Sequence, residues 1–543
     1  MRRKHYVWLV NAMERVYPDR IPSPDPDADK LDAITGGVAA VVVAARPERD
    51  GEVRLEFAGW EDDVEWPAPS LQALRSVRVE TNSVQKCKAG PWNRKQAPYL
   101  LRRSPFRVFE VICPKSRTQV KAHHTQAFLV LLEIPGEARL GSSRFRLRVT
   151  GAGLDETLRA QVTVHGVRLP RQRLKVTNWL FFDRLLKRYP GVKPWSARHW
   201  ELIEQALQVL RAGGQNMILL PYFGPSGLVD VRRRGKRYRF DFARLDRLAH
   251  TAFKMGYQYL EGGELAGKKI NPDGKGCDLT DNDVYIRIPG LDGEEGPQIN
   301  AEEEEAKEFL RQFLPALREH VVKNGWLSIY CQHVADEPFP ACAESYCRTV
   351  DFVRSVFPGV PLVDAASGHA AAYALEIPVP EIDGLEPYQD FYRRLARQGK
   401  EFWFYVCCSP VGPWPNRFLD FHLNKGGLLP WFNFHYGAAG FLHWGAAWWY
   451  EDDPYEHSHF QGDAFILYPG KDGPLASMRW LAERIGVEDY ELLRHLCDRV
   501  SKGEALARRI CRRLITDATH FRYDTRSVDR ARKALRSAAA KAG

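Results

Sequence analysis

The sequence predicts an α/β protein in which an antiparallel β-sandwich precedes a (β/α)8 barrel of the TIM type, with a helical C-terminal extension. Short alternating apolar runs fill the first part of the chain, apolar runs then alternate with amphipathic helical stretches, and helical patterns continue to the end. A chain of 543 residues exceeds what one core usually serves, and a barrel takes about 250 of them. We place the sandwich at residues 1–170, the barrel at 171–455 and the extension at 456–543.

The first region is typical of a sandwich because its strands follow one another without helical patterns between them. An apolar stretch from Tyr6 to Met13 begins it. This stretch is too short for the core of a signal peptide, so we expect a first strand and a cytoplasmic protein. Turns with polar, Gly or Pro residues separate the further predicted strands, at residues 38–47, 52–60, 106–114, 126–135, 144–151 and 158–167.

Parallel α/β architecture is indicated from residue 174 onward, because buried strands of a parallel sheet are near-continuous apolar runs. No Gly-rich phosphate loop follows the first of these runs, which argues against a nucleotide-binding doubly wound fold. Eight repeats favour a closed barrel over an open sheet. The predicted strands lie at residues 175–182, 215–223, 257–264, 326–338, 361–367, 381–387, 401–408 and 440–449.

The C-terminal extension is predicted to hold a short strand at residues 464–470 and then helices. Glu488 and Asp489 indicate one helix start and Ser527 another, because such side chains favour helix N-termini. The chain carries 78 Lys+Arg against 68 Asp+Glu, and part of this excess lies near the end. We expect solvated basic helices there. Binding of nucleic acid would rest on charge alone, so no nucleic-acid partner is expected.

Cysteine and hydropathy patterns exclude two further classes of protein. The 10 Cys are scattered without a C-x-x-C motif, which predicts reduced, mostly buried thiols and no disulfide framework. No run of about 20 apolar residues occurs, so no membrane span is expected. His457 and His459 have the spacing of metal ligands, but no Cys or acid partner lies at a known interval. We expect neither a metal nor an organic cofactor.

The fourth predicted barrel strand ends in two acids and a proline, Asp336, Glu337 and Pro338. The C-terminal ends of barrel strands carry the active site, so both acids should lie at the mouth. Pro338 disfavours helical backbone at Glu337, which predicts an extended chain through the pair. His333, three residues before Asp336, should point to the opposite side of the strand. The alternative interpretation is a helix start, where acids interact favourably with the helix dipole.

Paired carboxyl groups suit the hydrolysis of a glycosidic bond, which needs a proton donor and a group that handles positive charge at the anomeric carbon. Adjacent side chains diverge, so they suit a reaction in which the sugar's own 2-acetamido oxygen attacks that carbon. Glu337 would act as general acid and then base, while Asp336 would orient the acetamido group and stabilise the oxazoline-like intermediate. Neighbouring carboxylates also push their pKa values apart, which keeps one of them protonated near neutral pH.

Aromatic side chains at strand ends supply a second indication, because polar groups fix the hydroxyls of a sugar while rings stack on its C–H faces. Core packing is the alternative for each ring, since buried aromatics dominate cores as well. The residues that we expect to contact substrate are Trp179, His333, Glu386, Tyr388, Tyr405, Trp444 and Trp448.

Four stretches carry a resemblance to a known family: HVADEP (333–338), WFYVCCSPVGPWPNRFLD (403–420), GFLHWGAAWW (440–449) and GDAFILYPGKDGPLASMRWLAERIGVEDYELL (462–493). Together they resemble glycoside hydrolase family 123 and its relatives, over residues 175 to about 500. The resemblance implies a retaining exo-β-N-acetylgalactosaminidase with a β-sandwich before its barrel. It implies an adjacent catalytic Asp-Glu pair, which maps onto Asp336 and Glu337, and it adds Asn416 to the expected substrate contacts and supports Trp444.

The expected substrate is an oligosaccharide or glycoconjugate that ends in a β-linked amino sugar. The sixth predicted strand ends in LEPYQD (385–390), where the family resemblance leads us to expect an apolar ending that contains Trp, so the epimer stays open. One alternative is hydrolysis of another β-glycoside, either an N-acetylglucosaminide or a sugar without the acetamido group. The other is a sugar-binding barrel without catalysis.

Overall fold

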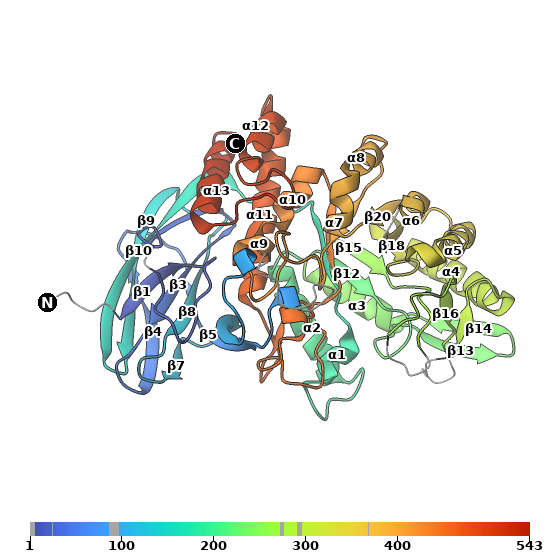
Figure 1. The fold of residues 1–543 in the computed structure, drawn as a ribbon, viewed down its shortest axis with the longest axis horizontal. Coiled ribbons are helices and arrows are strands. Elements are labelled where there is room, and N and C mark those ends of the chain that lie inside the picture. Colours follow the sequence, from blue (N-terminus) through green and yellow to red (C-terminus); the bar gives the residue numbers. More distant parts are fainter. Residues whose placement is uncertain are drawn as a thin grey trace. The chain divides into compact units, whose positions relative to one another are not determined.

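The computed structural model describes residues 6–23, 25–85, 97–271, 276–289, 296–366 and 369–542. The protein is a mixed α/β protein with a β-rich N-terminal region and a helical C-terminus (Figure 1). Its chain divides into two compact units. The first is built from Met1–Leu174, Cys408–His435 and Tyr450–Gly543, and the second from Lys175–Cys407 and Tyr436–Trp449. The three-part division expected from the sequence stays a prediction.

Two five-stranded sheets make up the β-rich part of the first unit. One has the order β1-β3-β8-β5-β6 and the other β2-β10-β9-β4-β7. Neighbouring strands run antiparallel, except that β2 and β10 pair in parallel. The strands are β1 (Val7–Asn11), β2 (Lys30–Thr35), β3 (Val38–Ala45), β4 (Gly51–Trp60), β5 (Ser70–Val79), β6 (Phe106–Cys113), β7 (Arg117–Val120), β8 (Gln126–Glu133), β9 (Gly141–Gly151) and β10 (Leu154–Arg168).

The two sheets share one apolar core. Residues two apart on one strand, such as Val41 and Val43 of β3, lie in it together because successive side chains of a strand point to opposite faces. β2, β5 and β7 are strands that the sequence did not predict. In β5 a bulge between Arg75 and Ser76 shifts the register, which breaks the alternation that a sequence pattern would reveal.

The helical end of the chain begins with α11, and the helix start predicted at Glu488 and Asp489 is wrong. Both acids are buried in the middle of α11, where Asp489 accepts hydrogen bonds from Trp431 and Arg532. Buried partners stabilise an acid inside a helix, and those partners come from distant parts of the chain. The remaining helices and strands of the first unit are α9 (Leu423–Gly427), α10 (Leu429–Tyr436) up to His435, β23 (Tyr468–Pro469), β24 (Pro474–Leu475), α11 (Met478–Arg499), α12 (Gly503–Cys511) and α13 (Thr525–Ala540).

Eight strands of the second unit run parallel in two sheets, of orders β12-β15-β18-β19-β20 and β11-β22-β21. β13–β14 and β16–β17 are antiparallel hairpins. The strands are β11 (Lys175–Asn178), β12 (Met217–Leu220), β13 (Asp230–Arg234), β14 (Arg237–Asp241), β15 (Tyr259–Gly262), β16 (Tyr285–Arg287), β17 (Gln298–Asn300), β18 (Tyr330–His333), β19 (Leu362–Ala365), β20 (Ile377–Val379), β21 (Trp403–Tyr405) and β22 (Gly440–His443).

One apolar cluster joins the two parallel sheets. Several strands contribute residues two apart, as expected when one face of each strand looks into a common core. β15 contributes the partly buried Tyr259. The fully packed members are Trp179, Met217, Leu219, Cys331, Val363, Ala365, Ile377, Val379, Trp403, Tyr405 and Leu442.

The sixth parallel strand is not where the sequence placed it. β20 is the short run Ile377–Val379, whereas residues 382–385 form helix α7 and residues 386–388 a 3-10 turn. β20 contains Pro378 and is followed by Pro380, which removed the usual strand signal because prolines are rare inside sheets. The other seven predicted strands overlap observed ones.

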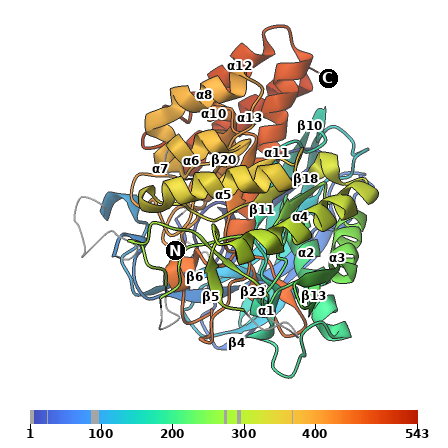
Figure 2. The same ribbon diagram turned by 90° about the vertical axis from the view of Figure 1, so that its right-hand side faces the viewer.

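Helices separate the parallel strands, and α4 and α5 lie side by side in the view of Figure 2. α3 shows why they form: its buried residues Leu245, Leu248, Ala249 and Ala252 recur at helical spacing. The helices are α1 (Phe182–Leu186), α2 (Ala197–Ala212), α3 (Ala243–Lys254), α4 (Glu304–Lys323), α5 (Ala343–Val356), α6 (His369–Ala374), α7 (Ile382–Leu385), α8 (Gln389–Arg397) and α10 (Leu429–Tyr436).

Nine cysteines lie in the described ranges, and all nine are free thiols. Cys87, Ser367 and Gly368 lie outside these ranges. Among the helices that the structure describes, none has the length and apolar character needed to cross a membrane.

Candidate active site

Asp336 and Glu337 lie three and four residues beyond β18, where the chain bends. The backbone does not stay extended through the pair, contrary to the expectation from Pro338. Glu337 has a φ of 45°, in the left-handed region that side chains other than Gly rarely adopt. Such a conformation costs about 1–3 kcal/mol and persists only where surrounding contacts hold it.

Two contacts hold the carboxylate of Glu337. The hydroxyl of Tyr405, at the end of β21, donates a hydrogen bond of 2.7 Å to its Oε1. The ammonium group of Lys268 lies 3.5 Å from its Oε2. The side chain of Glu337 is still 40% exposed, so a ligand can reach it. Tyr405 was expected at the site, whereas no sequence pattern pointed to Lys268.

Asp336 is half-buried and lies among other carboxyl groups. Burial raises its pKa well above the usual range, and the negative charges of Glu264 and Glu337 raise it further. Lys268 and His333 lower the pKa by a smaller amount. The Asp336 carboxyl therefore tends to hold a proton when no ligand is bound.

Glu264 is a third carboxyl group near the pair, and the sequence analysis did not select it. It follows β15 by two residues, and the next two N–H groups, of Leu265 and Ala266, donate to the carbonyl of Val334. Its side chain is exposed, yet its pKa is raised to about 7, because desolvation by surrounding protein and the charges of Asp364 and Glu337 outweigh the lowering by the cations His333 and Lys268. An acid at the end of an apolar run was a signal in the sequence, since the same rule selected Asp336.

A buried carboxylate–imidazole–carboxylate chain lies at the ends of the same strands. His333 is the last residue of β18, and its Nε2 is 2.6 Å from Oε1 of Glu261 and its Nδ1 2.9 Å from Oδ1 of Asp364. None of the three has exposed side-chain surface. Burial lowers the pKa of His333, but the two carboxylates outweigh it and raise the pKa to about 10. The imidazole is thus charged at neutral pH.

This chain fixes the backbone that leads to the acid pair. Asp364 accepts hydrogen bonds from the N–H groups of Val334 and Ala335, at 3.1 and 3.0 Å, and one of 2.7 Å from the Tyr346 hydroxyl. On the other side, Glu261 accepts from Thr177 at 2.6 Å and from the indole of Trp179 at 3.0 Å. The segment before Asp336 is therefore held by side chains from β11, β15 and β19.

Two of the predicted ligands lie in this buried chain. Both nitrogens of His333 are engaged by carboxylates, and Trp179 is only 4% exposed and packs edge-on against His333 at 5.3 Å. Both side chains help to hold the end of β18 in place. Direct contact of either with sugar stays a prediction.

Trp444 and Trp448 form an aromatic pair after β22. Their rings are 5.7 Å apart at 62°, and both are half-buried. Phe181 packs edge-on against Trp448 at 4.9 Å, and the guanidinium of Arg184 lies over the same ring at 3.9 Å. Partly exposed rings held by neighbours are suited to stack on an apolar sugar face.

The remaining predicted ligands lie elsewhere. Glu386 and Tyr388 are in a 3-10 turn after α7, where Glu386 accepts a hydrogen bond from Tyr436, and Tyr388 is 47% exposed. Asn416 belongs to the first unit, where its amide donates to the carbonyls of Ser409 and Pro410. Among the residues that the structure describes, no group of three or more His, Cys, Asp or Glu is placed to hold a metal ion.

The site therefore combines three carboxyl groups, one ammonium group and one phenol, on a strand end that buried contacts hold in place. Two of the three carboxyls, Asp336 and Glu264, have raised pKa values, and Glu337 is in contact with Tyr405 and Lys268. Such a set is able to donate and accept protons near neutral pH.

A comparison with protein families matches residues 179–496 to the catalytic domain of glycoside hydrolase 123. A comparison with solved structures matches a family 123 glycoside hydrolase from Clostridium perfringens, described for glycolipid glycan hydrolysis. That match has a TM-score of 0.74 at 12% identity and covers 98% of this chain and 96% of the other. At this identity it shows a shared fold. A comparison with curated proteins gave no match.

Two further solved structures are less similar. The β-glucuronidase of Parabacteroides merdae matches with a TM-score of 0.32 at 9% identity, over 85% of this chain and 51% of that one. The endo-β-1,4-mannanase of Thermotoga petrophila matches with a TM-score of 0.36 at 12% identity, over 59% and 77%.

Proposed function

The chain belongs to glycoside hydrolase family 123, which supports glycosidase activity, and on this basis we propose that it is a retaining exo-β-N-acetylgalactosaminidase with substrate-assisted catalysis. Its substrate would be an oligosaccharide or glycoconjugate with a terminal β-linked N-acetylgalactosamine. The observation that carries the proposal is the adjacent pair Asp336 and Glu337 on a fixed strand end, with Glu337 held by Tyr405 and Lys268.

We further propose that the two parallel sheets of the second unit close into a (β/α)8 barrel. Hydrogen bonds support both junctions: the N–H of Asn216 donates to the carbonyl of Val176, and the N–H of Tyr405 to that of Pro380. The common apolar cluster would then be the barrel interior. In such a barrel the acid pair, Glu264 and Tyr405 would all lie at the C-terminal ends of strands, where active sites of this fold occur.

In the proposed reaction Glu337 protonates the glycosidic oxygen while the acetamido oxygen of the substrate attacks the anomeric carbon. The bond to the leaving group breaks, and an oxazolinium ion forms. Asp336 accepts the acetamido N–H and balances the positive charge. Glu337, now ionised, takes a proton from water, which attacks the anomeric carbon and restores the acetamido group. Two inversions give overall retention.

This assignment needs the proton on Glu337 when substrate is bound, whereas the raised pKa in the empty site is that of Asp336. The three carboxyls interact, so their protons are shared within the set. Donation of the acetamido N–H to Asp336 favours the ionised form of that carboxyl. Substrate binding would thus move the proton to the group that donates it.

Glu264 supports a second candidate, the hydrolysis of a β-glycoside without an acetamido group. Such a reaction needs a nucleophile other than the substrate, and Glu264 is an exposed carboxyl near the pair: its charge raises the pKa of Asp336, and the charge of Glu337 raises the pKa of Glu264. In that case Glu337 would remain the general acid and Asp336 would lose its role in orienting the substrate.

Hydrolysis of a panel of nitrophenyl glycosides tests both candidates. The panel holds the β-N-acetylgalactosaminide, the β-N-acetylglucosaminide and the β-galactoside, each with the wild type and Asp336→Asn. We expect turnover of acetamido sugars only, greatest for the galacto epimer, and its loss in Asp336→Asn even with this good leaving group. Glu305→Gln, on the exposed start of α4, is the matched control. Turnover of the β-galactoside that Asp336→Asn leaves intact would reject the proposal and favour the second candidate.

A further inference from the structure

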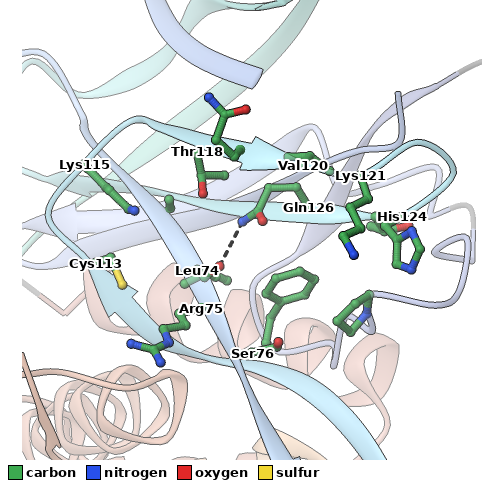
Figure 3. Close-up of a pocket in the computed structure, with 15 residues that line it drawn as sticks. Leu74, Arg75, Ser76, Cys113, Lys115, Thr118, Val120, Lys121, His124 and Gln126 are labelled. Carbon is green, nitrogen blue, oxygen red and sulfur yellow. Dashed lines mark hydrogen bonds between the residues drawn. The ribbon is translucent and has the colours of Figure 1, made fainter. Parts of the chain in front are cut away.

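A cavity of about 490 Å³ opens in the first unit, within the range of about 300–1,000 Å³ that is usual for small-molecule sites. It lies where β5, β6 and β8 of one sheet face β7, the edge strand of the other. Figure 3 shows its lining side chains, with Lys115 and Lys121 on opposite sides of Gln126. This cavity has no part in the proposed hydrolysis.

The charge of the lining is of one sign. Arg75, Lys115, Lys121 and His124 line the cavity, and no Asp or Glu does. Asp50 contacts the segment after Lys121, where its carboxylate accepts the N–H of Ala122, but it does not line the cavity. A concave surface with cations of one sign concentrates anions.

Among the residues that the structure describes, neither of the two lysines at the cavity has an acidic partner. Within the described part of the chain, no carboxylate lies within ion-pair distance of Lys115 or Lys121. By contrast, Arg148 pairs with Asp155 at 2.9 Å, and the same holds for many exposed arginines of this unit. Two ammonium groups at one cavity whose lining holds no carboxylate leave its positive charge available to an external anion.

The backbone of the lining holds both lysines in place. The Lys115 N–H donates to the Cys113 carbonyl at 2.7 Å, and its own carbonyl accepts from Ala73 at 2.6 Å. The Lys121 carbonyl accepts from the N–H of His124 at 3.1 Å. A ligand would therefore order only side chains, which lowers the entropic cost of binding.

Neutral groups in the lining suit a sugar rather than a bare ion. Thr118 and Gln119 make no side-chain hydrogen bond within the described residues, and the Ser76 hydroxyl accepts from Arg107 and keeps its own hydrogen for another acceptor. Phe109 and Leu74 supply apolar surface. Hydroxyl partners, apolar surface and unpaired cations together match a saccharide that carries an anionic substituent.

From these observations we infer that the cavity is a second carbohydrate site, which binds a mono- or disaccharide bearing a sulfate, phosphate or carboxylate group between Lys115 and Lys121. It would hold acidic glycans on the enzyme independently of the hydrolytic site, so its existence does not depend on the proposed activity.

Calorimetric titration of the full chain tests the inference, with N-acetylgalactosamine 6-sulfate, glucuronate, inorganic sulfate and neutral N-acetylgalactosamine as probes. The variant is Lys115→Gln with Lys121→Gln, and the matched control is Lys323→Gln with Lys400→Gln, which removes the same charge from exposed positions elsewhere. We expect the anionic sugars to bind, more weakly at high salt, and at least about tenfold more weakly in the Lys115/Lys121 variant but not in the control. Sulfate alone should bind more weakly than the sulfated sugar.

The affinity for neutral N-acetylgalactosamine and the turnover of nitrophenyl glycosides should be the same in the Lys115/Lys121 variant as in the wild type, because both measurements report on the hydrolytic site. The inference is overturned if no anionic sugar gives saturable binding, if the two double variants weaken binding equally, or if the sulfated and neutral sugars bind alike in both. Both lysines are exposed, and an unchanged thermal midpoint would show that the variant is folded.

Discussion

Two sets of carboxyl groups at the ends of β15, β18 and β19 have contrasting surroundings. Glu261 and Asp364 have no exposed surface and share the charged imidazole of His333. Glu264 lies three residues beyond Glu261, and Asp336 three beyond His333, yet neither side chain makes a hydrogen bond in the described structure. Both are accessible, and both have raised pKa values.

The contrast shows that neighbours, rather than residue type or strand, separate a structural acid from a reactive one. Glu261 and Asp364 share a buried cation and hold the backbone, although burial raises the pKa of Asp364 as well. A carboxyl that is desolvated beside like charges keeps an exchangeable proton. Glu337 has features of both sets: a phenol and an ammonium group are its partners, yet 40% of its side chain is exposed.

The largest expected effect is that of removing the proposed proton donor, Glu337. Glu337→Gln should reduce turnover of a glycoside with a poor leaving group by roughly 10²–10⁴-fold, the usual contribution of general acid catalysis. A nitrophenyl or dinitrophenyl leaving group should partly restore the rate, since it needs less protonation. Rates across a series of aryl glycosides measure this dependence. An equal loss for all leaving groups would mean that Glu337 does not donate the proton.

A substitution in the buried set should instead lower the free energy of unfolding. His333→Ala leaves Glu261 and Asp364 without their shared cation, and breaking a buried pair typically costs about 3–5 kcal/mol of the free energy of unfolding. Denaturant unfolding at neutral pH measures it, with Glu264→Gln as the comparison, for which we expect less than about 1 kcal/mol. If the two variants lost similar stability, the division into structural and reactive acids would be wrong.

The stability that His333 provides should also depend on pH. Its pKa is raised from 6.5 to about 10, so folding is coupled to proton uptake. The stabilising contribution is therefore complete below pH 6.5 and is lost as the pH rises toward 10. The difference in unfolding free energy between wild type and His333→Ala should shrink over this interval.

Tyr405→Phe tests whether the phenol of Tyr405 positions Glu337. It removes the hydrogen bond to Oε1 of Glu337. A hydrogen bond to a charged group contributes about 1.5–3 kcal/mol, so kcat should fall by roughly 10-fold to 100-fold. Tyr373→Phe, at an exposed tyrosine, is the control. An unchanged kcat would show that Glu337 is held by Lys268 alone.

The smallest expected effect is a shift in the pH profile of Glu264→Gln. Glu264 raises the pKa of Asp336 by its negative charge, and its own pKa is about 7. Removing this charge lets the remaining carboxyls ionise at lower pH. The fall of the rate on the alkaline side should therefore move to lower pH, with little change in the maximal rate. A pH profile identical to that of the wild type would show that Glu264 does not affect the ionisation of the catalytic carboxyls. A complete loss of activity would favour a role of Glu264 as nucleophile.

The sequence by itself determined those features that depend on local pattern. Alternating runs located most strands of the sheets in the first unit, and apolar runs between amphipathic helices located seven of the eight parallel strands. The position of Asp336 and Glu337 just after β18 also followed from one segment. These predictions worked because strand periodicity and the acids at a strand end are carried by neighbouring residues.

The tertiary structure decided the rest, because it depends on which distant residues meet. Lys268 had no signal in the sequence, and the signal of Glu264 gained its meaning only when the pairing of β15 with β18 brought both residues to the acid pair. The pattern could not show that Glu261 and Asp364 would enclose His333, or that the backbone would turn to a positive φ at Glu337. Electrostatics at short range set the role of each acid, and those distances exist only in the folded chain.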